Sequence, residues 1–235
     1  MADSPKKAAG DFVDQINRTR DAVIKEKKNI SPPKIRKYED NPKKELIKDL
    51  IETGCFKLGE FKLKSGIISP FYIDLRMIIS YPSILYRVGM AYISILENLE
   101  CTRIAGIPFA GIPIASSISL LKNIPMIFPR LVMKKHGTGN RIEGKYEKDD
   151  KIVLVDDLIT TGKSKFEAID VLKSDGIDIK DLVVLVERGA TGRKELNSIG
   201  VKLYSYIKIE EFLDVCLETG RLTNNKYNEI MKFLK

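Results

Sequence analysis

Short, continuous apolar runs recur along the chain and alternate with segments of helical periodicity. Strands composed of continuous apolar residues, separated by helices, are typical of a parallel sheet that is covered on both faces. The pattern therefore predicts an α/β fold. The predicted strands are residues 103–108, 125–129, 151–157, 181–189 and 201–207, and the predicted helices are residues 81–99, 110–123, 162–176 and 210–220.

A different pattern precedes this alternation. Asn41 is a suitable cap for a helix with Pro42 at its first position, and Gly54 ends the apolar face that follows. Residues 55–76 alternate apolar and polar positions on both sides of a Ser-Gly pair, which predicts a hairpin or a pair of short strands. We expect residues of about 42–75, together with C-terminal segments, to form a small cap within the main domain.

Residues 1–40 are weakly helical and then charged and proline-bearing, so we interpret them as an extension and residues 41–235 as the main domain. Of the net charge of +8, +5 falls in residues 1–44, where twelve Lys or Arg face seven Asp or Glu. Such an arm is usually a solvated helix or tail, and it is only weak support for nucleic-acid binding.

The remaining composition favours a folded cytoplasmic protein. The 235 residues are 43% hydrophobic, enough for one sizeable core. No apolar stretch reaches the roughly 18 residues of a membrane helix, and the start lacks the apolar core of a secretory signal. Three widely spaced cysteines without metal-ligand spacing fit reduced thiols. We therefore expect no membrane association.

The strand at 151–157 ends in Asp156 and Asp157 and leads directly into the turn "LITTGKS". Ligands of open parallel sheets bind at the carboxyl ends of strands, where a helix start offers free N–H groups to an anion. Hydroxyl groups and a glycine at residues 160–164 suit a phosphate. The carboxylates suit sugar hydroxyls or a metal-bound water, because they would repel the phosphate itself.

Two other interpretations of this stretch remain. A Walker-type loop needs a glycine five residues before Gly162, and the chain has Asp157 there. A capped helix start with an acidic pair that binds nothing is the structural alternative. The order of apolar strand, two acids and hydroxyl-rich turn favours a ligand site.

The same stretch resembles the phosphoribosyl-pyrophosphate (PRPP) signature of the type I phosphoribosyltransferases. The resemblance implies that fold, a central parallel sheet flanked by helices with a small N-terminal hood. It implies that Asp156 and Asp157 contact the ribose hydroxyls and that the following loop holds the 5-phosphate. The PRPP-binding residues implied in this loop are Leu158, Ile159, Thr160, Thr161, Gly162, Lys163 and Ser164.

Further segments resemble the orotate phosphoribosyltransferase branch. "FKLKSGIISPFYIDLR", residues 61–76, matches a hood motif that purine-specific relatives lack. The resemblance assigns orotate binding to Lys64, the region of Phe71 and Tyr72, Thr160 and Arg188. Hydrophobic packing remains the alternative for the two aromatic residues, and a surface charge for the arginine.

Two loops resemble the diphosphate-binding parts of the family. "GIPFAGIPIAS", residues 106–116, corresponds to a loop in which some members carry a lysine where this chain has Ala110. "RLVMKKHGTGNRIEG", residues 130–144, resembles the mobile catalytic loop and departs from it at Leu131, where a second lysine is normal. A solvated basic loop is the alternative for this segment. The family residues matched here are Arg130, Lys134 and His136, with Lys135 as a candidate substitute for the missing lysine.

The resemblance implies transfer of phosphoribosyl from PRPP to orotate, giving orotidine 5'-monophosphate and pyrophosphate in pyrimidine (UMP) biosynthesis. The implied catalytic residues are Arg130, Lys134, His136, Asp156 and Asp157. Mg²⁺ is the implied cofactor, carried on PRPP without direct protein ligands. The implied partners are a second copy of the chain, with shared active sites, and a separate orotidine monophosphate decarboxylase, for which residues 1–40 are a candidate docking element.

Two alternative functions stay open at this point. A PRPP-sensing regulator that binds nucleic acid would use the basic arm, but it has no need of the hood motif or the loop histidine. A purine phosphoribosyltransferase is disfavoured by "LKSGIISPFY".

Overall fold

The structure is a computed structural model that describes residues 41–62, 66–131 and 141–234. The extension expected at residues 1–40 lies outside the described residues. So do four residues that the family resemblance assigns to the site, namely Lys64, Lys134, Lys135 and His136. None of the helices in the described ranges combines the length and the apolar character needed to cross a bilayer.

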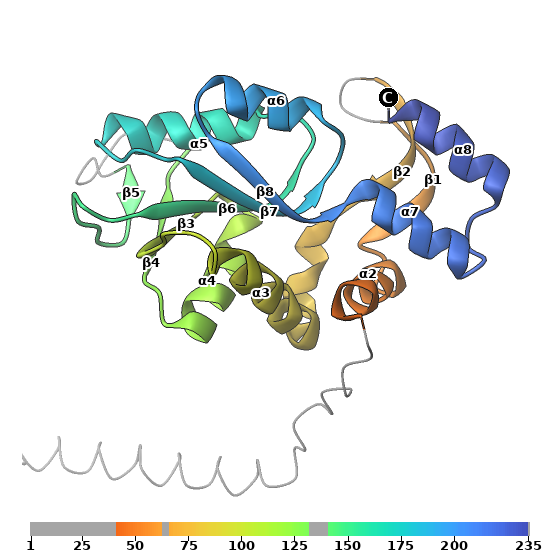
Figure 1. Ribbon diagram of the computed structural model, residues 1–235, viewed down its shortest axis with the longest axis horizontal. Coiled ribbons are helices and arrows are strands. Elements are labelled where there is room, and N and C mark those ends of the chain that lie inside the picture. Colours follow the sequence, from red (N-terminus) through yellow and green to blue (C-terminus); the bar gives the residue numbers. More distant parts are fainter. Residues whose placement is uncertain (1–40, 63–65, 132–140, 235) are drawn as a thin grey trace, which may run out of the picture. The chain divides into compact units, whose positions relative to one another are not determined.

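A six-stranded sheet forms the centre of the described chain (Figure 1). Its strands follow the order β5-β4-β3-β6-β7-β8, and all pairs are parallel except β4 with β5. The predicted α/β fold with a parallel sheet is confirmed, and β5 adds an antiparallel edge within a segment expected to be loop. The strands are β3 (Arg103–Gly106), β4 (Met126–Pro129), β5 (Ile142–Glu143), β6 (Ile152–Ile159), β7 (Asp181–Glu187) and β8 (Lys202–Lys208).

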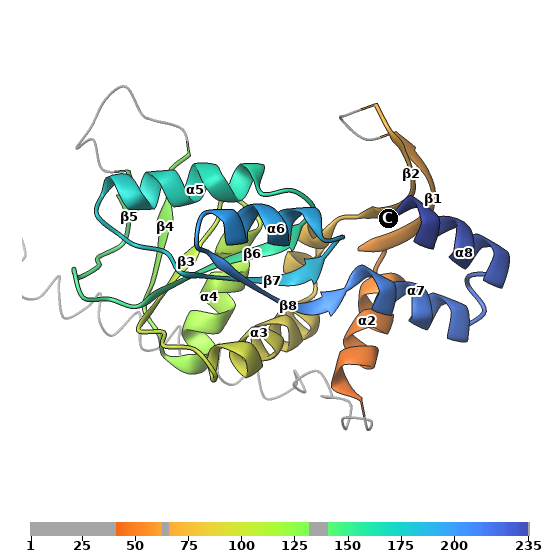
Figure 2. The ribbon, with the colours of Figure 1, turned by 45° about the horizontal axis from the view of Figure 1, so that its top comes forward.

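Helices cover both faces of this sheet, with α3 and α4 on one side and α5 and α6 on the other (Figures 1 and 2). Val153 and Val155 of β6 belong to the apolar cluster under α3 and α4, and Leu154 belongs to the one under α5 and α6. Successive strand residues point to opposite faces, so a strand covered on both sides is apolar throughout. The helices are α3 (Pro82–Leu96), α4 (Gly111–Lys122), α5 (Lys163–Ser174) and α6 (Thr191–Ser198).

The hood combines segments from both ends of the described chain. Strands β1 and β2 form the predicted hairpin and pair antiparallel, and the Asn41 side chain accepts a hydrogen bond from Lys44 N at 3.0 Å as the predicted cap of α2. The Phe56 ring stacks on Phe212 of α7 with centroids 4.9 Å apart. The hood elements are α2 (Pro42–Glu52), β1 (Phe56–Lys62), β2 (Ile68–Ile73), α7 (Ile209–Glu218) and α8 (Asn224–Phe233).

Several elements differ from the sequence prediction. Strand β6 continues two residues beyond the acidic pair, because Leu158 and Ile159 still pair with Val186 and Glu187 of β7. The short 3₁₀ helix η2 (Leu75–Ser80), α6 and α8 were not predicted. Helix α6 buries only a glycine and a leucine, so it lacks the apolar stripe by which a helix is recognised. Helix α8 does carry such a stripe, because Ile230 is buried and Tyr227, Met231 and Leu234 pack against the core, and the sequence prediction overlooked it.

Candidate active site

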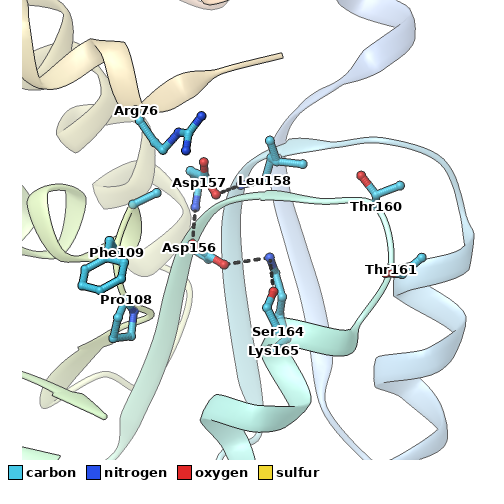
Figure 3. A pocket seen from close by; sticks show the side chains of 11 residues that line it. Arg76, Pro108, Phe109, Asp156, Asp157, Leu158, Thr160, Thr161, Ser164 and Lys165 are labelled. Atoms are coloured by element: carbon cyan, nitrogen blue, oxygen red, sulfur yellow. Dashed lines mark hydrogen bonds and ion pairs between the residues drawn. The ribbon is translucent and has the colours of Figure 1, made fainter. Parts of the chain in front are cut away.

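A pocket of about 410 Å³ opens at the carboxyl ends of β3 and β6 (Figure 3). Three segments line it: the end of β6 with the turn into α5, the loop between β3 and α4, and Arg76 of η2. Carboxyl ends of neighbouring parallel strands meet at one edge of a sheet, which is why segments distant in sequence share this pocket.

The acidic pair lies on β6, inside the strand and before the turn. Asp156 comes two residues after Leu154, so its side chain points to the same face of the sheet, toward α5. There its Oδ2 lies 2.7 Å from Lys165 Nζ. Asp157 faces the opposite side of the sheet and lines the pocket opposite Arg76. Strand alternation therefore directs the two side chains to different faces of β6, while both still line the same pocket.

Backbone groups hold both carboxylates in place. Asp156 Oδ1 accepts a hydrogen bond from Asp157 N at 2.9 Å, and Asp157 Oδ1 accepts one from Leu158 N at 2.7 Å. Burial and the neighbouring charge of Asp156 raise the pKa of Asp157 to about 7, while Lys165 acts in the opposite direction. At near-neutral pH the pair thus stands at the point of gaining or losing one proton.

Thr160, Thr161 and Ser164 of the predicted phosphate loop line the pocket together with Leu158. The Ile159 side chain is fully buried in the core under α5 and α6, which leaves only its backbone for a ligand. Lys163 is the first residue of α5, and its side chain is not among the pocket-lining groups.

Gly162, the remaining member of the loop, already has a partner. Its N–H donates to Glu195 Oε2 of α6 at 2.6 Å. A Cβ atom at Gly162 would lie 2.6 Å from the Phe166 ring, so only glycine fits this turn without a shift of the ring. The Glu195 carboxylate therefore accepts the hydrogen bond from a backbone N–H that the sequence prediction assigned to the phosphate of PRPP.

The loop between β3 and α4 packs directly on β6. A Cβ atom at Gly111 would lie 2.6 Å from Val155 O, and one at Gly106 would lie 2.9 Å from Gly111 O. These two glycines let the loop, including the pocket residues Pro108 and Ala110, approach the acidic pair. The loop thus lies beside the PRPP signature, and its role in binding the diphosphate stays a prediction.

Sequence reasoning missed two cations that line the pocket, Arg76 and Lys165. Arg76 donates from Nε and Nη2 to the two carboxylate oxygens of Asp74, at 2.7 Å each. Lys165 has a usable signal in the sequence. It precedes Ala168, Ile169 and Leu172 at the spacing of a core-facing stripe, so a charge at this position indicates a buried partner.

Arg188 follows β7 and reaches into the hood. Its guanidinium carbon lies 4.4 Å from the centroid of the Phe71 ring, and its Nη2 donates to Ser69 Oγ at 3.0 Å. Burial lowers the pKa of Arg188. No carboxylate in the described ranges pairs with this cation.

The two aromatic residues assigned to orotate have different environments. The Phe71 ring is fully buried and stacks on Phe56, so packing accounts for the side chain and only the backbone is available to a base. Tyr72 is 37% exposed and points to the opposite face of β2, where its ring lies 5.5 Å from Phe61. The hairpin thus does not present both rings to one ligand.

The predicted catalytic loop is described only at its ends. Arg130 forms an ion pair with Glu143 and does not line the pocket. Leu131 packs against the apolar cluster under α5 and α6, which gives a structural reason for an apolar residue where the family pattern has lysine. The catalytic roles of this segment stay predictions.

Comparisons with known proteins place this chain among named relatives, although no family model matches it. It is 35% identical to the bifunctional enzyme PyrF/PyrE of Nostoc sp., over 91% of this chain and 45% of the relative. It is 35% identical to the orotate phosphoribosyltransferase of Pyrobaculum aerophilum, over 80% of this chain and 97% of the relative. The solved UMP synthase of Leishmania donovani matches with a TM-score of 0.74 at 37% identity, over 83% of this chain and 42% of that structure. The chain therefore spans less than half the length of the bifunctional relative and nearly all of the archaeal one.

Proposed function

Because the chain belongs to the orotate phosphoribosyltransferase family, we propose that it transfers the phosphoribosyl group of PRPP to N1 of orotate, giving orotidine 5'-monophosphate and pyrophosphate in pyrimidine biosynthesis. The observation that carries this proposal is the pocket at the end of β6. There the acidic pair, a hydroxyl-rich turn and a helix N-terminus face one cavity.

The chemistry of this pocket supports a sugar phosphate. Carboxylates accept hydrogen bonds from hydroxyls, so Asp156 and Asp157 suit the ribose of PRPP. Hydroxyls of Thr160, Thr161 and Ser164, with the start of α5, offer donors to a phosphate. The volume of about 410 Å³ lies in the usual range for small-molecule sites.

Arg188 supports an anionic acceptor. The cation is partly desolvated, is oriented by Ser69 and the Phe71 ring, and pairs with no carboxylate in the described residues. The carboxylate of orotate would supply the missing anion, and charged hydrogen bonds of this kind are among the strongest. Lys64 and Thr160 complete the proposed orotate contacts.

Catalysis in this proposal rests on positioning and charge stabilisation. The bond between the anomeric carbon and the diphosphate breaks as the bond to orotate N1 forms, so positive character develops on the sugar and negative charge on the leaving group. Arg130, Lys134 and His136 would stabilise the diphosphate, with Lys135 as the substitute at the Leu131 position. Closure of their loop would exclude water.

Mg²⁺ is part of the proposal as a companion of PRPP. Among the described residues, no group of three or more His, Cys, Asp or Glu could hold a metal ion. Mg²⁺ prefers about six oxygen ligands, which substrate phosphates and water can supply. Its chemistry there is to neutralise charge on the diphosphate.

A homodimer with shared active sites is also proposed. Phe109, beside the pocket, is 87% exposed, and Leu120 of α4 is 86% exposed. Helix α3, which packs on α4, also carries exposed apolar side chains, Tyr86 and Met90. A second copy packed on these helices would cover them, and the family resemblance implies that its segment 130–144 would then reach this site. An orotidine monophosphate decarboxylase as a further partner, with residues 1–40 as its candidate docking element, and a cytoplasmic location stay predictions.

The test mixes protein, PRPP and magnesium with orotate and follows the loss of orotate absorbance, with uracil, adenine and hypoxanthine in parallel. We expect consumption of orotate alone. Consumption of a purine base would contradict the acceptor. Binding of PRPP without consumption of any base would favour the PRPP-sensing regulator, and a shift assay with salt titration would then test nucleic-acid binding.

A further inference from the structure

Lys165 is a lysine at a core-facing position of α5. It is 6% exposed and belongs to the same helix face as Ala168, Ile169 and Leu172. Lysine is almost never buried to this degree unless it is paired, because removing its charge from water is costly. The residue therefore has a specific partner.

That partner is the first acid of the PRPP signature. Lys165 Nζ lies 2.7 Å from Asp156 Oδ2 and 3.3 Å from Ser164 Oγ, and Figure 3 shows the three side chains meeting at the pocket. Both charged side chains are only 7% exposed. Apolar residues of similar volume can often replace a buried ion pair without loss of stability, so the fold alone gives no reason for this pair.

The other elements packed around the acidic pair add little positive charge near Asp156. The Tyr92 hydroxyl of α3 donates a hydrogen bond to the backbone oxygen of Asp156. Arg76 of η2 faces the pocket, but its guanidinium is hydrogen-bonded to Asp74. Among the described residues, Lys165 is thus the cation in direct contact with the pair.

We infer that Lys165 is a positioning residue for PRPP: its ion pair holds the Asp156 carboxylate in one orientation, so that the acidic pair can accept hydrogen bonds from the ribose hydroxyls. This inference rests on the proposed function and adds a role for a residue outside the signature. A carboxyl group that keeps its proton offers fewer acceptor sites, so a site without Lys165 holds the ribose less well.

The electrostatics of the neighbouring acid agree with this role. Burial and the charge of Asp156 raise the pKa of Asp157 to about 7, and Lys165 opposes the rise. Without the lysine, two carboxylates would share a desolvated site with no cation in contact, and the pair would keep a proton to higher pH. PRPP binding should then need more alkaline solution.

The experiment measures the PRPP dissociation constant by calorimetry between about pH 5.5 and 9 for the wild type, Lys165→Met and Lys165→Arg. Lys173→Met changes an exposed lysine on the same helix and serves as the matched control. The phosphates of PRPP titrate identically in every experiment. A difference between variants in the pH midpoint of PRPP binding therefore comes from the protein. We expect the Lys165→Met midpoint to move up by about one pH unit or more, with about tenfold weaker binding at pH 7 and recovery at high pH.

The remaining outcomes separate the hypotheses. Lys165→Arg keeps the charge, so we expect it to retain the wild-type midpoint. A loss of affinity in Lys165→Met that is equal at every pH, or no loss, would overturn the inference. If Lys165→Met does not fold, a midpoint shift in Lys165→Arg would overturn it instead, and an unchanged midpoint would support it. Failure of the wild type to bind PRPP contradicts the proposed function itself.

Discussion

The guanidinium of Arg188 lies 4.4 Å from the centroid of the Phe71 ring and connects the end of β7 to the hood. A second contact, from Arg188 Nη2 to Ser69 Oγ at 3.0 Å, fixes its orientation. Because Phe71 also stacks on Phe56, the cation rests on the aromatic core of the hood. A movement of the hood would therefore displace the Arg188 guanidinium, which we propose binds the orotate carboxylate.

Replacing Arg188 with lysine should weaken orotate binding selectively. A lysine keeps the charge but loses the planar fork and the stacking on Phe71. Loss of a charged hydrogen bond costs about 1.5–3 kcal/mol, so we expect the KM for orotate to rise about 10- to 100-fold. Initial rates at varied orotate and saturating PRPP measure this.

Arg221→Gln is the control for that substitution, because Arg221 is exposed in the loop before α8. It should leave both KM values unchanged. A rise in the KM for PRPP rather than orotate in Arg188→Lys would assign Arg188 to the other substrate.

Substitution of Glu195 tests whether its carboxylate competes with PRPP for a backbone N–H of the phosphate loop. Its carboxylate accepts the Gly162 N–H at 2.6 Å, so a bound phosphate must compete with a negative charge for this donor. We expect Glu195→Gln to lower the dissociation constant for PRPP about tenfold, measured by calorimetry at neutral pH. Lys194→Gln, on the neighbouring exposed position, is the control. Weaker binding in Glu195→Gln would show that the carboxylate braces the loop for its ligand.

The raised pKa of Asp157 predicts a stability that falls as pH rises. A carboxyl group with a pKa near 7 in the folded state and 3.8 when unfolded binds its proton more tightly in the folded protein. Its contribution to the free energy of unfolding is complete below about pH 4 and is lost as pH rises through about 7. Asp157→Asn removes this dependence, so we expect the ligand-free variant to gain about 2–3 kcal/mol over the wild type between pH 5 and pH 8.

Urea unfolding at the two pH values gives the free energies for that comparison. PRPP binding by Asp157→Asn should be lost at both, which would separate the stability effect from the function. A constant difference between the two proteins across this range would contradict the assigned pKa direction.

Arg193 should stabilise the strand that precedes Arg188. Glu187 is 6% exposed and accepts hydrogen bonds from Arg193 Nε and Nη2 at 2.7 and 2.6 Å, and from Ser205 Oγ at 2.7 Å. Arg193→Met leaves this carboxylate without its main partner, so we expect a loss of about 2 kcal/mol in the free energy of unfolding.

The effect of Arg193→Met should depend on pH in a defined direction. Although burial opposes it, hydrogen bonds from Arg193 and Ser205 lower the pKa of Glu187. The wild-type advantage is therefore present above the ordinary pKa of a glutamate and disappears as the solution becomes more acidic. Urea unfolding across an acidic series measures it, and an advantage that grows on acidification would refute the assignment.

The sequence by itself determined the parts whose signals are local. Continuous apolar runs identified the parallel strands, because residues of a strand buried on both faces must all be apolar. Asn41 marked the start of α2 through its own cap, and the order of strand, Asp156, Asp157 and hydroxyl-rich turn predicted where the pocket lies. Each of these signals lies within a few consecutive residues.

Only the tertiary structure decided which distant residues meet. Pairing with β7 extends β6 beyond the acids, and Leu131 packs against the apolar core under α5 and α6. Helix α6, which has no apolar stripe, places the Glu195 carboxylate at the Gly162 N–H. Likewise, the helical spacing indicates only that Lys165 faces the core, and Asp156 becomes its partner because α5 packs that face against β6. Side-chain contacts across elements depend on register and packing, which no short stretch of sequence encodes.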